Sequence, residues 1–200
     1  MYTVIGTPKS RAMRVIWMLE ELGEPYEIDP VPPRGDEARA HNPMAKVPSL
    51  KTPEGTLCDS VAILTYLADR HGKLTYPAGT VERARQDFAT QTIVSEIDAA
   101  LWLAAKHSFA LPEDWRVAGV KDTARKEFAR GMAALESIKG DDPYLAGDRF
   151  TIADLLLSHC AGWARLAKFD LPGGDFGDWL KSLSKRPAMQ AALKRAAELG

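Results

Sequence analysis

Two short segments of this sequence combine groups suited to binding a charged ligand. Val47-Pro48 opens an apolar run. Because proline has no N–H for a sheet, we expect this pair to turn the chain, as a cis peptide, and to present backbone groups to a ligand. Asp59-Ser60 stands where a second strand gives way to an apolar helix over residues 61–67. A hydroxyl, a carboxylate and the N–H groups of a helix start can hold a zwitterion with a carboxylate and an ammonium group.

Two more hydroxyls, those of Thr7 and Ser10, flank the predicted start of the first helix. A helix N-terminus carries about half a positive charge and free N–H groups, so either hydroxyl could donate to an anionic group of a ligand. The structural alternative is that Ser10 only caps the helix, which is worth about 1 kcal/mol.

The elements that must position these groups follow from periodicity and from breaks at glycine and proline. Residues 2–5 and 26–29 are predicted strands around a helix over about 11–22, which indicates a parallel pair. Residues 47–51 and 56–58 predict an antiparallel hairpin, followed by a helix over about 60–71. Residues 30–42 are expected to form a loop with at most a short helix.

The pattern changes beyond a segment rich in glycine and proline at residues 72–79. Helices are predicted over about 81–109, 116–138, 151–168, 176–184 and 187–198. We therefore expect an α/β domain over residues 1–77, a linker over 78–84 and an all-helical domain over 85–200.

Composition excludes several function classes. The net charge of −1, with both signs mixed, argues against a nucleic-acid or membrane-surface binder. With no 18-residue apolar run and no leader pattern, the chain is expected to be soluble and cytoplasmic. Four scattered histidines and two distant cysteines predict no metal site.

The two cysteines, Cys58 and Cys160, do not form a C-x-x-C motif, which excludes dithiol exchange by the protein alone. Both are expected to pack as small apolar side chains. Residues 151–154 (TIAD) fit a capping box before an apolar run, so Asp154 is assigned to folding rather than to chemistry.

Three groups of segments, in order, resemble those of cytosolic glutathione S-transferases. Residues 42–50 (NPMAKVPSL) and 57–67 (LCDSVAILTYL) match the family's N-P-x-G/A-K-V-P run and the D/E-S pair that opens a helix ending in Y-L. Residues 7–15 (TPKSRAMRV) resemble the family's first strand-to-helix turn, and residues 144–154 (YLAGDRFTIAD) resemble the start of its central helix. The resemblance implies a thioredoxin-like βαβ-ββα domain followed by a helical domain, glutathione as co-substrate and a homodimer.

For the thiol, the resemblance implies a Tyr, Ser or Cys in the first turn. The turn holds no cysteine, and Tyr2 lies too early on the strand, so we assign the thiolate to Ser10, with Thr7 as the next candidate.

For the rest of the tripeptide, the resemblance implies strand-like backbone contacts to Val47, beside Pro48. Lys46, with help from His41, would meet the glycine carboxylate; the alternative is that each is a simple surface residue, which is the usual case for a lone lysine and the favoured interpretation for His41. Ser60 would take the γ-glutamyl carboxylate and Asp59 the ammonium group. The family more often has Glu before this serine, and the shorter Asp makes the ammonium contact the less secure one.

The same resemblance makes Trp102, Phe109 and Trp115 candidate liners of an electrophile pocket, along with His107, with core aromatics as the alternative. Asp98 matches in position an acidic residue that some members lend to the partner subunit.

The predicted function is conjugation of glutathione to hydrophobic electrophiles. The alternatives are a glutathione-binding or protein-interaction member of the same fold that does not conjugate, and a glutathione-dependent isomerase, dehalogenase or peroxidase.

Overall fold

The computed structural model describes residues 1–199, which form two compact units. The first contains Met1–Thr75 and the segment that begins at Ser184, and the second contains Tyr76–Leu183.

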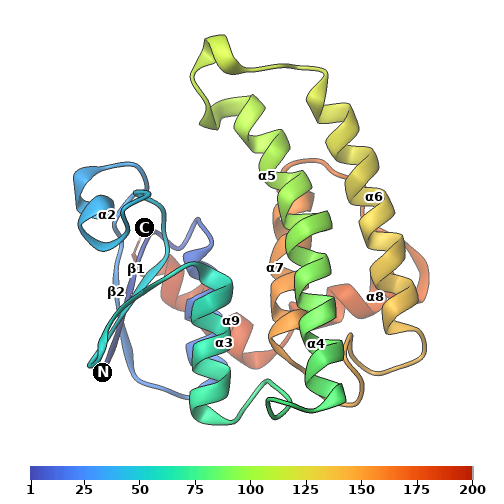
Figure 1. The fold of residues 1–200 in the computed structure, drawn as a ribbon, viewed down its shortest axis with the longest axis horizontal. Coiled ribbons are helices and arrows are strands. Elements are labelled where there is room, and N and C mark those ends of the chain that lie inside the picture. Colours follow the sequence, from blue (N-terminus) through green and yellow to red (C-terminus); the bar gives the residue numbers. More distant parts are fainter. Residues whose placement is uncertain (200) are drawn as a thin grey trace. The chain divides into compact units, whose positions relative to one another are not determined.

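A four-stranded mixed sheet forms the centre of the first unit (Figure 1). Its strands are β1 (Tyr2–Ile5), β2 (Tyr26–Asp29), β3 (Ser49–Thr52) and β4 (Gly55–Cys58), in the order β2-β1-β3-β4. β1 and β2 are parallel, whereas β3 is antiparallel to both β1 and β4. The predicted parallel pair and hairpin are therefore confirmed.

Helices α1 (Ala12–Leu22) and α3 (Ser60–His71) pack against each other and against the sheet. Val15, Ile16 and Leu19 of α1 are completely buried, because apolar residues fill one face of this helix. α1 ends at Gly23, whose φ of 73° gives the left-handed helix end that glycine adopts most easily. The short helix α2 (Asp36–His41) contributes Ala38 to a separate small apolar cluster with Ile5 and Val31.

The last helix, α9 (Pro187–Ala197), belongs to the first unit, where it packs against α1. Arg186 pairs with Glu21 through two hydrogen bonds of 2.6 and 2.8 Å, and the Trp17 indole N–H also donates to Glu21, at 3.0 Å. This arrangement differs from the division expected from the sequence, which assigned residues 85–200 to one helical domain. The helical pattern of α9 carries no information about which unit the helix covers.

Replacing Arg186 with alanine is expected to lower the free energy of unfolding by about 2–4 kcal/mol. The Glu21 side chain is 8% exposed, so the substitution leaves a largely buried carboxylate without its bidentate partner. Urea denaturation followed by circular dichroism measures the loss.

The matched control is Lys181→Ala, which breaks the exposed ion pair with Asp178 and should cost less than about 1 kcal/mol. Equal losses for the two variants would show that the Arg186 pair does not fasten α9.

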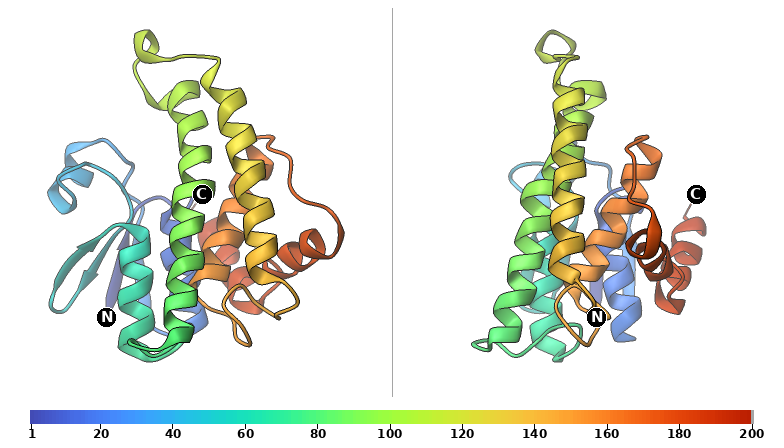
Figure 2. Two further views of the ribbon diagram at one scale, coloured as in Figure 1. Left: turned by 45° about the vertical axis from the view of Figure 1, so that its right-hand side comes forward. Right: turned by 90° about the vertical axis from the view of Figure 1, so that its right-hand side faces the viewer.

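The second unit is helical. It contains α4 (Val81–Thr92), α5 (Ala99–Ala105), α6 (Val120–Lys139), α7 (Ile152–Leu166) and α8 (Gly174–Leu183), with π-helical turns at Ile93–Asp98 and Lys106–Ala110 and a 3₁₀ turn at Glu113–Trp115. Figure 2 shows α5 and α6 running side by side, joined by a long turn. Because α4 begins at Val81, it takes up part of the 78–84 segment expected to be a linker. Among residues 1–199 no helix combines the length and apolar character needed to cross a bilayer.

Buried apolar side chains of α7 form the centre of the second unit, and Leu155, Leu156, Leu157 and Cys160 are completely buried. The predicted capping box is present at the start of this helix. Asp154 accepts hydrogen bonds from the Thr151 and Leu145 N–H groups, at 2.8 and 2.9 Å, and from the Thr151 hydroxyl, at 3.0 Å.

Candidate functional site

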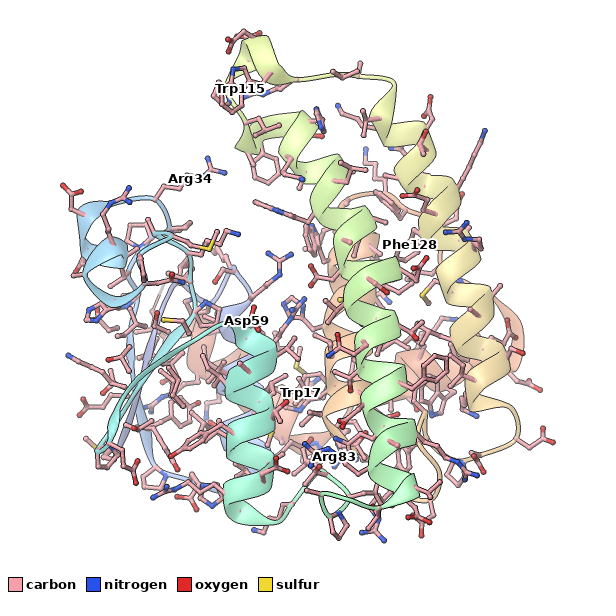
Figure 3. The ribbon with its side chains drawn as sticks, viewed as in Figure 1. Trp17, Arg34, Asp59, Arg83, Trp115 and Phe128 are labelled. Atoms are coloured by element: carbon pink, nitrogen blue, oxygen red, sulfur yellow. The ribbon has the colours of Figure 1, made fainter. Side chains whose placement is uncertain are left out.

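Three segments of the first unit meet at one end of the sheet. Ser49 pairs with Ile5 on one side and with Cys58 on the other. The residues just beyond these pairs are therefore neighbours: the turn that begins at Gly6, the Val47-Pro48 pair and the Asp59-Ser60 pair. Figure 3 shows Asp59 at the N-terminal end of α3. The sheet register thus brings together the segments that carry most of the sequence-predicted site residues.

Gly6 allows the first of these segments to approach the second. Its φ is 141°, and a Cβ built on it would lie 2.9 Å from the Val47 Cβ and 3.2 Å from the Ala12 Cβ. A side chain at position 6 would therefore push Val47 away from the turn. The Val47–Pro48 peptide itself is cis, and Pro48 is buried.

Asp59 combines an unusual backbone conformation with a capping role. Its φ of 71° lies in a region that residues other than glycine rarely adopt, and such conformations cluster at ligand sites. One carboxylate oxygen, Oδ1, accepts hydrogen bonds from the N–H groups of Val61 and Ala62, at 2.9 and 3.1 Å. The side chain is nevertheless exposed, so Asp59 can cap α3 and still face a ligand.

Ser60 is the first residue of α3 and is 3% exposed. Its Oγ accepts a hydrogen bond of 3.1 Å from Nη1 of Arg14, which is itself 1% exposed. Sequence reasoning missed Arg14. The available signal was a charged residue inside the apolar run of α1, where a lysine or arginine is rarely buried without a specific partner.

The two candidate thiolate donors differ in their hydrogen bonds. The Ser10 hydroxyl donates to the Thr7 carbonyl at 2.7 Å and accepts from the Ala12 N–H at 3.1 Å. It therefore stabilises the turn into α1, although the N-cap position itself falls on Arg11. Within residues 1–199, no hydrogen bond involves the Thr7 hydroxyl.

The other candidates lie at the rim. Lys46 is exposed, and its carbonyl accepts a hydrogen bond of 3.1 Å from Asn42. His41, at the end of α2, is half-buried, and its carbonyl accepts the Cys58 thiol proton at 3.2 Å. Cys58 is also half-buried, rather than fully packed in the sheet, and lies 3.5 Å from the Ser49 hydroxyl.

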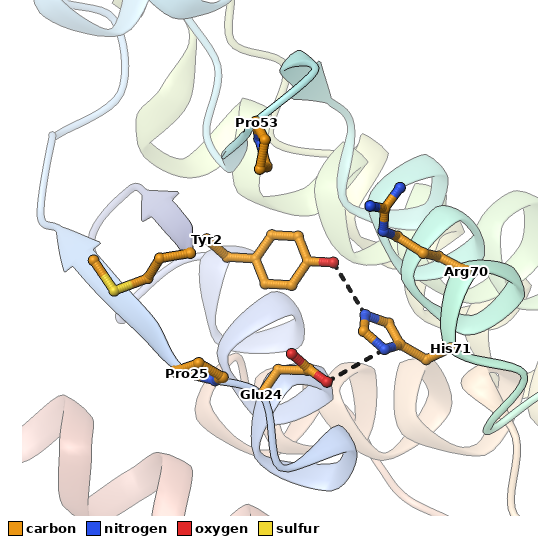
Figure 4. Close-up of a pocket in the computed structure, with 7 residues that line it drawn as sticks. Tyr2, Glu24, Pro25, Pro53, Arg70 and His71 are labelled. Carbon is orange, nitrogen blue, oxygen red and sulfur yellow. Dashed lines mark hydrogen bonds and ion pairs between the residues drawn. The ribbon is translucent and has the colours of Figure 1, made fainter.

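Tyr2 lies at the opposite end of β1 from these segments. Figure 4 shows its hydroxyl bonded to His71 Nε2 at 3.0 Å, while His71 Nδ1 lies 3.3 Å from Glu24. These residues line a separate cavity of about 270 Å³. Burial raises the pKa of the Tyr2 phenol above its usual value, which favours the neutral form. Tyr2 therefore remains outside the site, as the sequence indicated.

The aromatic candidates belong to the second unit. Trp102 is half-buried, but Phe109 and Trp115 are 65% and 64% exposed, so the last two are not core residues. Figure 3 shows Trp115 in the turn between α5 and α6. Arg116 fastens this turn by donating to the carbonyl of Leu111.

Asp98 is largely buried, and the Cys160 thiol points to one of its carboxylate oxygens at 3.9 Å. No cluster of three or more His, Cys, Asp or Glu side chains suited to a metal ion occurs in residues 1–199.

Comparisons with known proteins identify two family regions. Residues 4–75 match the glutathione S-transferase N-terminal domain, and residues 118–195 match the glutathione S-transferase C-terminal domain. The chain is 29% identical to glutathione S-transferase GstA of Escherichia coli O157:H7 over 163 residues, which is 80% of this chain and 78% of the relative. It is 32% identical to the probable maleylacetoacetate isomerase 1 of Drosophila melanogaster over 139 residues, 68% of this chain and 54% of that protein.

A solved structure extends the likeness to the whole fold. The glutathione transferase URE2P6 of Phanerochaete chrysosporium, in complex with oxidised glutathione, superposes with a TM-score of 0.81 at 27% identity. The match covers all of this chain and 97% of that one. The paired family domains, the thioredoxin-like sheet and the helical second unit lead to one conclusion: the chain belongs to the glutathione S-transferase family.

Proposed function

We propose that this protein is a glutathione transferase that conjugates the glutathione thiolate to hydrophobic electrophiles. The observation that carries the proposal is the meeting of the Gly6 turn, Val47-Pro48 and Asp59-Ser60 at one end of the sheet. Relatives that share the fold include a transferase in complex with oxidised glutathione. A site built from strand-like backbone, a helix start and hydroxyls suits an extended zwitterionic tripeptide.

In this proposal each part of glutathione has its own partner. Val47 offers its backbone N–H and C=O to the cysteinyl residue, beside Pro48. Lys46, with His41 nearby, faces the glycine carboxylate. The Ser60 hydroxyl and N–H hold the γ-glutamyl carboxylate, and Asp59 meets the ammonium group with the oxygen that does not cap α3.

The thiolate would be held by a hydroxyl in the turn before α1. We favour Thr7 over Ser10, because the Ser10 proton is already donated to the Thr7 carbonyl. A hydroxyl that donates to S⁻ favours the ionised form, which is the attacking species. The thiolate sulfur then forms a bond to a carbon of the electrophile as the leaving group departs from that carbon. The protein contributes by holding the two reactants close together and by stabilising the charge.

Trp102, Phe109 and Trp115 are proposed to contact the electrophile. The two exposed aromatic rings of the α5–α6 turn offer apolar surface that nothing else in the second unit covers among the described residues. We also propose that the protein works as a cytoplasmic homodimer.

The alternatives use the same glutathione site. The likeness to a maleylacetoacetate isomerase favours a glutathione-dependent isomerase as the second candidate. A protein that binds glutathione but converts no electrophile would instead be a binding member of the family.

Replacing Ser60 with alanine is expected to weaken glutathione binding about 10- to 100-fold, because one charge-assisted hydrogen bond to the carboxylate is lost. Isothermal titration calorimetry measures the affinity, and the rate with an activated aryl chloride measures conjugation.

Ser182→Ala, which removes an exposed hydroxyl of the second unit, is the matched control and should bind like the wild type. A wild type that does not bind glutathione refutes the proposed function. Binding without conjugation of any electrophile supports the alternatives, and turnover of a cis-enone diacid would single out the isomerase.

A further inference from the structure

Arg14 is a buried charge placed directly behind the start of α3. It lies within α1, its exposed fraction is 1%, and its Nη1 donates to Ser60 Oγ at 3.1 Å. The two residues are 46 positions apart in the chain, so this hydrogen bond joins two different helices of the first unit. The Arg14–Ser60 hydrogen bond is therefore a tertiary contact, and its acceptor, Ser60, belongs to the proposed glutathione site.

The direction of this hydrogen bond constrains the Ser60 hydroxyl. A guanidinium group has only donors, so Ser60 Oγ must be the acceptor. The proton of the Ser60 hydroxyl must then point away from Arg14. A serine held in this way presents a donor to its surroundings rather than an acceptor.

The start of α3 acts in the same sense. The N-terminus of this helix carries a partial positive charge, which favours a bound carboxylate. Asp59 balances part of this potential, because one of its oxygens accepts from the Val61 and Ala62 N–H groups. A carboxylate bound at Ser60 would meet an outward hydroxyl proton and a helix N–H.

We propose that Arg14 is a positioning residue that turns the Ser60 hydroxyl toward the ligand and makes the site selective for the α-carboxylate of the γ-glutamyl group. This inference rests on the proposed function and adds that the α-carboxylate is the ligand group on which Arg14 makes binding depend. Arg14 does not touch the ligand. It acts through Ser60, so its removal affects ligands with this carboxylate and spares ligands without it.

The test compares three ligands that differ by one group each. They are glutathione, the analogue γ-aminobutyryl-cysteinyl-glycine, which lacks the α-carboxylate, and glutaryl-cysteinyl-glycine, which lacks the α-amino group. Their affinities are measured by calorimetry for the wild type, Arg14→Met and Arg14→Lys. Arg70→Met is the control, because Arg70 lies at the far end of α3 in an exposed pair with Glu54.

Arg14→Met is expected to weaken glutathione and the glutaryl analogue about 30-fold each, and the γ-aminobutyryl analogue less than 3-fold. Arg14→Lys keeps the charge but not the shape of the donor, so we expect a smaller loss with the same ligand pattern. Arg70→Met should bind all three ligands like the wild type.

Equal weakening of all three ligands by either Arg14 variant would show a merely structural role and overturn the inference, as would unchanged affinities. If Arg14→Met does not fold, the ligand pattern of Arg14→Lys decides the question by the same criteria. A wild type that binds none of the three ligands is a different result, which refutes the proposed function itself.

Discussion

Replacing Asp154 with alanine is expected to lower the free energy of unfolding by about 3–5 kcal/mol, enough to remove much of the stability of an ordinary domain. The side chain is completely buried and accepts hydrogen bonds from the Leu145 N–H, the Thr151 N–H and the Thr151 hydroxyl. Alanine leaves these donors buried without an acceptor. Thermal and urea unfolding of the purified variant measure the loss, which should also appear as a lower yield of folded protein.

The pH of this measurement matters. Burial raises the pKa of Asp154 from 3.8 to about 6, although the hydrogen bonds from Leu145 and Thr151 oppose part of this shift. Because the folded-state pKa is the higher one, the folded protein binds more protons than the unfolded chain between pH 4 and 6, and this carboxyl adds stability as the pH falls. At pH 8 it is ionised in both states, so the difference between variant and wild type reports the lost hydrogen bonds minus the cost of burying the carboxylate charge.

Thr80→Ala is the matched control for Asp154→Ala. Thr80 caps the start of α4 by accepting from the Arg83 N–H, and its loss should cost only about 1 kcal/mol. A soluble Asp154→Ala protein that melts at the wild-type temperature would contradict the structural role of this carboxylate.

Replacing Thr7 with valine is expected to lower kcat/KM for conjugation roughly 100-fold, the usual cost of losing one donor to a reacting anion. Valine keeps the shape of threonine and removes only the hydroxyl. Under the proposed function, this hydroxyl holds the thiolate of bound glutathione. Its loss should therefore raise the pKa of the bound thiol, which an ultraviolet titration of the thiolate measures, while the affinity for glutathione changes little.

Ser10→Ala separates the two hydroxyls. Ser10 donates to the Thr7 carbonyl and accepts from the Ala12 N–H, so its removal should cost about 1 kcal/mol of stability and only a few-fold in rate. If Ser10→Ala instead shows the larger loss of rate and the larger rise in thiol pKa, the assignment made from the sequence is the right one and Thr7 is not the donor.

The strands of the first unit could be predicted because each is indicated by residues that are neighbours in the sequence. The strands over residues 2–5 and 26–29 have the predicted bounds, since β-rich runs there are bounded by glycine and proline. In the second unit, the capping box could be predicted for the same reason, because four consecutive residues, 151–154, define it.

Contacts between distant residues were not predictable. Nothing in the sequence links Arg14 to Ser60, or Arg186 to Glu21, because each pair is brought together only by the packing of whole helices. The exposure of Phe109 and Trp115 also escaped prediction, since an aromatic residue near a helix end gives no sign of whether other elements cover it.

The return of α9 to the first unit has a consequence for how this protein can be divided. A single cut after Thr75 would not release a complete first unit, because α1 would lose the helix that covers it and Glu21 would lose its cation. By its contacts the helical unit interrupts the chain of the first unit, because the chain leaves that unit after Thr75 and returns to it at Ser184. The boundary drawn by contacts therefore differs from the family boundary, since the match to the C-terminal domain runs through most of α9.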